Sequence, residues 1–167
     1  MQQLLPGFAG SAVLDADGLN AAASLLNAGR ALPHPAGELI LTPHPGEMSR
    51  LTGLSTSALA ADREGAACRF AREWNAVVVL KGARTVVAAP DGRVRVNPTG
   101  NPGLSRGGSG DVLAGMTAAL LACRLPAYEA AACAVYLHGA AAVHGEYGML
   151  PHDILPELGR MFAEHQR

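Results

Sequence analysis

The apolar run Val77-Val78-Val79-Leu80 limits the possible folds more than any other feature of the sequence. Four successive positions carry no polar side chain, so a strand formed here must be covered on both faces. Sheets with strands buried on both sides are usually parallel and have helices packed on each face. Hydrophobic residues make up 49% of the chain but aromatic residues only 4%, which favours small aliphatic packing between helices and sheet over an aromatic-cored β-sandwich. The sequence therefore predicts an α/β architecture.

Turn residues divide the chain into alternating strands and helices. Short apolar runs predict further strands at residues 12–14 and 39–42. Residues 85–88 and 93–96 flank Pro90-Asp91-Gly92 and predict an antiparallel hairpin at the sheet edge. Apolar spacing predicts helices at residues 18–28, 57–74, 111–121, 127–144 and 153–164.

Size and charge exclude several classes of protein. A chain of 167 residues and 17.1 kDa is expected to form one domain. The net charge of −1 provides no basic stripe for a nucleic-acid backbone. Its apolar stretches are shorter than the ~20 residues that a membrane helix needs, and residues 1–10 lack the pattern of a secretory signal. We expect a cytoplasmic protein that binds neither nucleic acid nor membrane.

The cysteines and histidines do not form a metal-binding pattern. Cys68, Cys123 and Cys133 are odd in number, lack CxxC spacing and lie in alanine-rich helical patterns. We expect them to be small buried residues in a reducing compartment. No pair of histidines has HxH or HxxxH spacing, so no metal site is predicted.

A glycine-rich segment at residues 97–110 holds five glycines and two prolines and must be a loop. Gly107, Gly108 and Gly110 lack Cβ atoms just where the loop turns into a helix, so backbone N–H groups can approach a ligand closely. The helix dipole and the free N–H groups of a first turn both favour a phosphate. The spacing differs from a Walker A loop and from a Rossmann fingerprint, which excludes those two nucleotide folds.

Asp111 follows this loop and has two possible roles. Beside a bound phosphate, its carboxylate can accept a proton from a substrate hydroxyl that attacks phosphorus. The alternative is a glycine-rich turn in which Asp111 is only an acidic residue at a helix N-terminus.

Other polar residues follow the predicted strands. Lys81 ends the strand at 77–80 and is either a strand terminator or a phosphate partner. His44 lies between two prolines that fix the backbone, and it either faces a ligand or bonds the loop. Asp15 and Asp17 either line the site or cap a helix. His138 stands among apolar residues of a helix, where a buried histidine with satisfied hydrogen bonds is the commoner finding.

Several ordered blocks give the sequence a family resemblance. They are residues 14–20 (LDADGLN), 41–48 (LTPHPGEM), 80–87 (LKGARTVV), 99–115 (TGNPGLSRGGSGDVLAG) and 136–139 (YLHG). In this order they resemble the ADP-dependent NAD(P)H-hydrate dehydratase family, a branch of the ribokinase-like superfamily. The resemblance covers nearly all of the chain but only the C-terminal part of the family's domain, so residues 1–167 are expected to form one partial, N-terminally truncated domain.

The resemblance implies a fold and a reaction. The fold is a ribokinase-like three-layer α/β/α domain, with a mostly parallel sheet and an antiparallel edge hairpin. The reaction is repair of hydrated NADH or NADPH: ADP phosphorylates the ring hydroxyl, AMP leaves, and elimination of phosphate restores the cofactor. ADP is thus a co-substrate, and Mg²⁺ is expected to arrive with the nucleotide.

The resemblance also implies roles for particular residues. Asp111 is the expected catalytic base and contacts the substrate, and His44 also contacts the substrate. The expected nucleotide-binding residues are Lys81, Gly82, Ala83, Arg84, Thr85, Asn101, Gly107, Gly108, Ser109 and Gly110.

Two other functions stay open at this point. A ribokinase-like kinase for a small hydroxymethyl compound would use the same base and stop after phosphorylation. A truncated remnant would bind adenine nucleotide without turnover. Because the first part of the family's domain is absent, a sheet edge and apolar surface should be exposed, and we expect a homo-oligomer that covers them.

Overall fold

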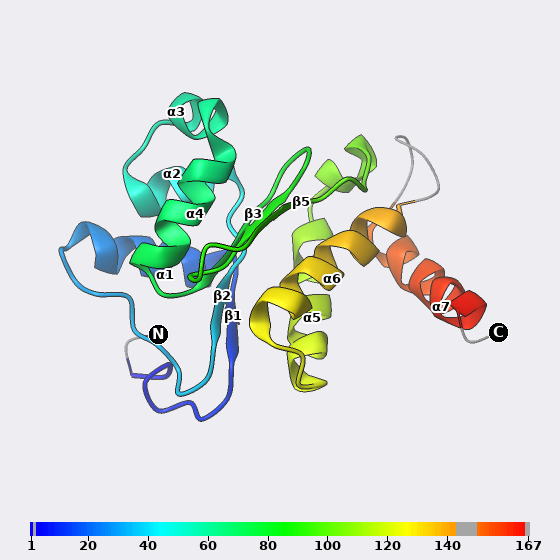
Figure 1. Cartoon of the computed structure of the whole chain (residues 1–167), viewed down its shortest axis with the longest axis horizontal. Helices are drawn as coiled ribbons and strands as arrows, with labels where there is room; N and C mark the ends of the chain where they lie inside the picture. Colours follow the sequence, from blue (N-terminus) through cyan, green and yellow to red (C-terminus); the bar gives the residue numbers. More distant parts are fainter. Residues whose placement is uncertain (2, 143–149, 166–167) are drawn as a thin grey trace.

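A five-stranded mixed sheet forms the centre of the computed structural model, which describes residues 1, 3–142 and 150–165 (Figure 1). Its strands lie in chain order, namely β1 (Ala12–Leu14), β2 (Leu39–Leu41), β3 (Val77–Leu80), β4 (Val86–Ala88) and β5 (Val94–Val96). The first three strands run parallel, while β4 and β5 are antiparallel to their neighbours. The predicted edge hairpin is therefore confirmed.

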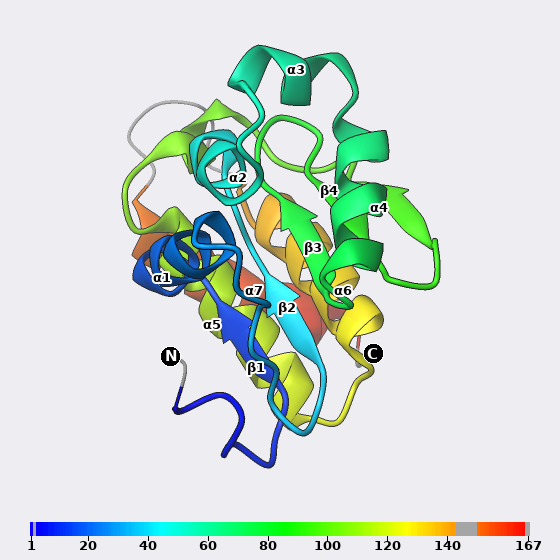
Figure 2. The same cartoon turned by 90° about the vertical axis from the view of Figure 1, so that its left-hand side faces the viewer.

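Helices cover both faces of this sheet, which gives the three layers expected (Figures 1 and 2). One face carries α1 (Asp17–Asn27), α2 (Pro45–Thr52), α3 (Thr56–Ala61) and α4 (Arg63–Glu73). The other carries α5 (Ser109–Ala122) and α6 (Ala127–Ala140). Beyond them lies α7 (Ile154–His165), and two short 3₁₀ turns, η1 (Pro102–Ser105) and η2 (Pro151–Asp153), complete the described elements.

The central strands supply apolar side chains to both layers. Along β3, Val78 and Leu80 pack with α1–α4, whereas Val77 and Val79 pack with α5 and α6. All four are buried. Successive side chains of a strand point to opposite faces, so an uninterrupted apolar run can satisfy two cores at once.

Three local expectations differ from the structure. The helix expected at 57–74 is two helices, because the Asp62 side chain accepts a hydrogen bond from the Gly65 N–H at 2.8 Å and starts α4 anew. Asp17 lies inside α1 and makes no capping bond. The helix expected to reach residue 144 has its last helical residue at Ala140, and residues 143–149 lie outside the described part of the chain.

The expectation of buried cysteines is wrong. Cys123 and Cys133 are exposed and Cys68 is half-buried. The sequence around Cys123 and Cys133 is apolar at nearly every position, so its pattern does not identify the outward face of either helix. Within the described residues, no helix is long and apolar enough to cross a membrane, and no three potential metal ligands cluster.

Polar side chains fasten the glycine-rich segment to the C-terminal half of α6 and to Ala142 just beyond it. Three of them donate hydrogen bonds to main-chain oxygens: Asn97 Nδ2 to Val135 O at 3.3 Å, Thr99 Oγ1 to Tyr136 O at 2.9 Å and Asn101 Nδ2 to Ala142 O at 2.6 Å. The start of the loop is thus held by main-chain oxygens of α6 and of Ala142.

Gly139 lets the loop lie directly on the helix. A Cβ at this position would stand 2.9 Å from the Gly100 nitrogen and 2.8 Å from the Thr99 carbonyl carbon. Both are backbone atoms, so they cannot move aside as the end of a side chain could.

We expect Gly139→Ala to lower the free energy of unfolding by about 1–3 kcal/mol, because the added methyl group overpacks the contact between helix and loop. Gly115→Ala in α5 is the matched control: no atom lies within 4 Å of its added Cβ. The control should raise the free energy of unfolding by about 0.5–1 kcal/mol through helix propensity. Urea denaturation measures both, and stabilisation by Gly139→Ala would contradict this packing.

Candidate active site

Charged side chains meet where β1 and β3 end. Asp15 follows β1 and Lys81 follows β3, and the parallel strands bring these ends to one edge of the sheet. Lys81 Nζ donates to Asp15 Oδ1 at 2.7 Å and lies 3.8 Å from Glu47 Oε2. The three side chains are only 18%, 13% and 7% exposed for Lys81, Asp15 and Glu47 respectively. Lys81 is therefore a largely buried cation between two carboxylates.

His44 begins α2 and holds Glu47 in place. Its Nδ1 accepts hydrogen bonds from the N–H groups of Gly46 at 3.0 Å and Glu47 at 3.3 Å. In return Glu47 Oε2 accepts from the His44 N–H at 2.8 Å, which completes a capping box. Because Nδ1 is an acceptor, the proton of the neutral ring lies on Nε2, which is 3.5 Å from Glu47 Oε1, and the ring as a whole is half-exposed.

The first turn of α5 has unpaired N–H groups. Gly108 is the N-cap residue, and the Ser109 N–H donates to Arg106 O at 3.2 Å. Among the described residues, no acceptor is found for the N–H groups of Gly107, Gly108, Gly110 and Asp111. This open set of donors at the positive end of a 14-residue helix fits the predicted anion site.

Gly110 brings that turn against the charged cluster. A Cβ on Gly110 would lie 3.3 Å from Lys81 Nζ and 3.6 Å from Asp15 Oδ2. The ammonium group and the free N–H groups therefore lie side by side, where both would attract the same anion. The next residue, Asp111, is exposed and has neither an ion pair nor a side-chain hydrogen bond within the described parts of the chain.

His138 packs behind this turn, as the interpretation of a buried histidine predicted. It is 7% exposed, and its Nε2 lies 3.0 Å from Ser109 O and 3.2 Å from Ser109 Oγ. Burial lowers the pKa of His138, the hydrogen bond to Ser109 O opposes this effect, and the charge on Lys81 lowers the pKa further. A neutral ring is thus favoured.

Residues 81–85 form a tight loop that Arg63 anchors. The Arg63 Nη2 donates to Leu80 O at 3.0 Å and to Lys81 O at 3.3 Å, and Thr85 Oγ1 donates to Gly82 O at 3.0 Å. Burial lowers the pKa of Arg63 below its usual value. The sequence offered no signal for this role of Arg63, because an arginine in the first turn of a helix is usually solvated.

A hollow of about 460 Å³ lies beside this loop. It is lined by Ala60, Ala61, Asp62, Arg63, Glu64, Ala83, Arg84, Val86 and Val96. Ala83 and Arg84, two of the expected nucleotide-binding residues, thus face open space next to the site.

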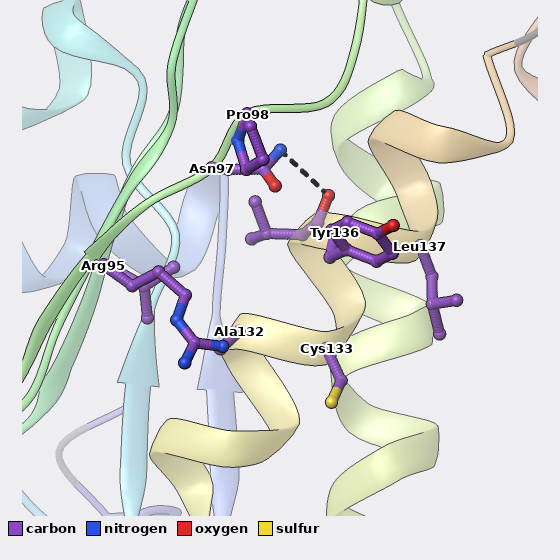
Figure 3. A pocket seen from close by; sticks show the side chains of 9 residues that line it. Arg95, Asn97, Pro98, Ala132, Cys133, Tyr136 and Leu137 are labelled. Carbon is purple, nitrogen blue, oxygen red and sulfur yellow. Dashed lines mark hydrogen bonds between the residues drawn. The ribbon is translucent and has the colours of Figure 1, made fainter.

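A second hollow, of about 250 Å³, lies between β5 and α6 and has mainly apolar walls (Figure 3). Arg95, Asn97, Pro98, Cys133 and Tyr136 are among its lining residues, and the bond from Asn97 to Val135 O crosses its wall. None of the predicted site residues lines it.

Three of the predicted site residues lie together: Lys81 and Gly110 are in contact, and Asp111 is next to Gly110 in the same turn. Asn101, in contrast, is bonded to the protein itself. Both polar atoms of the Asn101 side chain are engaged within the protein, since Nδ2 donates to Ala142 O and Oδ1 accepts from the Gly103 N–H. Glu47 was not among the predicted site residues, although its place three residues after His44 is the spacing of a capping box.

Comparison with known proteins finds close similarity. The sequence model for NAD(P)H-hydrate dehydratase matches residues 3–158. A bifunctional NAD(P)H-hydrate repair enzyme of Moorella thermoacetica is 49% identical over 163 residues, which cover 95% of this chain and 30% of that protein.

Solved structures agree with this similarity. An ADP/ATP-dependent NAD(P)H-hydrate dehydratase of Bacillus subtilis, co-crystallised with ATP and Mg²⁺, matches with a TM-score of 0.82 and 40% identity over 92% of this chain and 55% of that one. A ribokinase-like superfamily protein of Enterococcus faecalis matches with a TM-score of 0.77 and 29% identity, over 91% and 52%. The fold is therefore ribokinase-like, and the chain spans about half the length of these structures.

We expect Lys81→Met to lower the free energy of unfolding at neutral pH by about 2–4 kcal/mol, because two largely buried carboxylates would lose their cation. The double variant Asp15→Asn with Lys81→Met removes one of those charges and should recover part of the loss. Urea denaturation of the two single variants and the double variant measures the coupling. Additive losses in the cycle would show that the pair does not contribute to stability.

Proposed function

This chain belongs to the NAD(P)H-hydrate dehydratase family, and we propose that it carries the phosphoryl-transfer part of ADP-dependent dehydration of hydrated NADH or NADPH. The observation that carries the proposal is the first turn of α5, where unpaired N–H groups lie beside the Lys81 ammonium and the exposed Asp111 follows in the same turn. The proposed activity is that of a lyase that repairs a damaged cofactor.

In the proposed first step, the N–H groups at Gly107, Gly108 and Gly110 hold the terminal phosphoryl group of ADP. Lys81 balances part of its negative charge. Asp111 accepts the proton of the hydroxyl on the reduced nicotinamide ring as that oxygen attacks phosphorus, and AMP leaves with the bridging oxygen. The products of this step are AMP and a phosphate ester of the ring.

In the second step the ester eliminates. The bond from ring carbon to oxygen breaks, phosphate leaves with the electron pair, and the ring nitrogen lone pair supports the electron-poor carbon that forms. Loss of a proton from the adjacent ring carbon restores the double bond of NADH or NADPH. Phosphorylation is useful here because phosphate is a far better leaving group than hydroxide.

The loop at residues 81–85 is the proposed support for the rest of the nucleotide. Lys81, Gly82, Ala83, Arg84 and Thr85 lie between the charged cluster and the 460 Å³ hollow. Ser109 and Asn101 contribute by holding the loop, since their described side-chain bonds run to the protein itself. His44 is the proposed contact to the hydrated ring, because its imidazole is half-exposed.

The residues present fit a magnesium ion that accompanies the nucleotide. The Asp15 and Glu47 carboxylates already converge on a cation, the Lys81 ammonium, and carboxylate oxygens suit Mg²⁺. No cluster of three potential ligands is found in the described residues, which is compatible with an ion held mainly by phosphate oxygens and water. When bound, the ion would neutralise charge on the phosphates.

The proposed reaction and its alternatives can be separated in one assay. The protein is incubated with hydrated NADH and ADP while the absorbance of the dihydronicotinamide is followed. Recovery of that absorbance supports the dehydratase, a stable phosphorylated product supports a small-molecule kinase, and binding of ADP without either product supports a remnant without turnover.

We expect Asp111→Asn to lower the rate of cofactor recovery by about 10²–10⁴-fold, the usual contribution of a general base. Binding of ADP should persist, because the N–H groups and Lys81 remain. Under saturating ADP at about 100 times Kd, both proteins should gain about 2.7 kcal/mol of stability, measured as a rise in Tm. Wild-type rates in the Asn variant would remove Asp111 from its proposed role.

Gly110→Ala should weaken ADP binding about tenfold or more while leaving the unliganded protein as stable as before. The added methyl group would lie 3.3 Å from Lys81 Nζ, so the ammonium group must shift by a few tenths of an ångström, which keeps its ion pair with Asp15 but moves it away from the phosphate. Alanine also favours the helix. Isothermal titration measures the binding, and unchanged affinity would show that the Lys81 contact is irrelevant to the ligand.

The expected homo-oligomer remains a prediction. Strand β1 has a strand neighbour on one side only in the described part of the chain, so its other edge is free to pair. Light scattering at several protein concentrations tests the prediction, and a monomer throughout would contradict it.

A further inference from the structure

Resting on the proposed function, we infer that His138 is a positioning residue that aims the Gly110 N–H at the phosphoryl group to be transferred. His138 is buried in α6 and does not reach the ligand region itself. Its described hydrogen bonds run to Ser109 alone, at 3.0 Å to the carbonyl oxygen and 3.2 Å to Oγ.

The first step of the argument concerns the direction of the hydrogen bond. Ser109 O lies closer to Nε2 than the Ser109 hydroxyl does, at 3.0 against 3.2 Å, and a carbonyl oxygen can only accept, so we assign the proton to Nε2. The imidazole is therefore a donor at Nε2, with its second nitrogen unprotonated in the neutral ring. Burial and the nearby charge of Lys81 both favour this neutral form, as the lowered pKa of His138 indicates.

The second step concerns the peptide unit. The carbonyl of Ser109 and the N–H of Gly110 belong to one planar trans peptide, in which the two groups point in opposite directions. A donor that fixes the oxygen therefore fixes the direction of the Gly110 N–H on the far side. No acceptor among the described residues takes the Gly110 N–H, and the same residue lies beside Lys81, since a Cβ on it would be 3.3 Å from Nζ.

The third step concerns strength. A hydrogen bond to a carbonyl polarises its peptide group, so the N–H of the same group becomes a better donor. The α6 scaffold can keep this geometry because the neighbouring Gly139 packs directly on the loop backbone. On the other side of the turn, Pro151 lies against Gly108, where a Cβ would be 3.3 Å from its Cγ.

Two substitutions of His138 distinguish the effect of losing the Nε2–H donor from the effect of losing side-chain volume. His138→Met keeps a bulky side chain but removes the N–H, whereas His138→Gln places an amide N–H near the position of Nε2. Val135→Ala is the matched control: it removes buried volume from the same helix without a described contact to Ser109. Full-length protein is used, and ADP and AMP are titrated by calorimetry.

We expect His138→Met to weaken ADP binding about tenfold, equivalent to about 1.4 kcal/mol. AMP lacks the phosphoryl group that the Gly110 N–H would hold, so its affinity should change less than threefold. His138→Gln should restore ADP binding to within about threefold of wild type, and Val135→Ala should lower Tm without changing the affinity for ADP.

Other results would overturn the inference. These are wild-type ADP affinity in the Met variant, equal losses of affinity for ADP and AMP, or a Gln variant that binds ADP as weakly as the Met variant.

A measurement without ligand tests the inference separately from the proposed function. The Gly110 amide resonance should shift in His138→Met but not in His138→Gln. If wild-type protein binds no ADP yet this pattern appears, the proposed function fails and the orienting role stands. If the resonance does not respond, the role is wrong.

Discussion

The structure around the site depends on one buried cation. Lys81 emerges from a fully apolar strand into a region where Asp15 and Glu47 supply negative charge and the first turn of α5 supplies N–H groups. The carboxylates compensate the cost of burying the ammonium group. Strand ends, the capping box of α2 and the glycine turn are all positioned with respect to this group.

Polar and apolar parts of the chain are sharply separated at this cation. Residues 77–80 are apolar because two helical layers cover β3, and the next residue can be charged only because the strand ends there. The ion pair joins β1 to β3 across the end of β2. The site therefore lies at the carboxyl ends of the sheet's own strands, and the core beneath it keeps it rigid.

Much of this could be predicted from the sequence. The run at 77–80 predicted a strand buried on both faces, the Pro90-Asp91-Gly92 turn predicted the hairpin, and the glycines before Asp111 predicted a turn with free N–H groups. The break at Asp62, the exposure of Cys123 and Cys133 and the anchoring role of Arg63 could not be predicted. In each case the outcome depends on which neighbour the folded chain supplies, and hydrophobic periodicity alone does not carry that information. The alanine-rich stretches are the extreme case, because every face of such a helix has the same pattern.

The contacts that hold the glycine-rich loop to α6 have an evolutionary consequence. Asn97, Thr99 and Asn101 bond to the main-chain oxygens at positions 135, 136 and 142, not to the side chains there. Those three positions are thus exempt from selection for a particular hydrogen-bonding residue and can drift as the surface or core around them requires. Divergent copies of this sequence could retain the same loop path while sharing few identities at these positions of α6 and just beyond it.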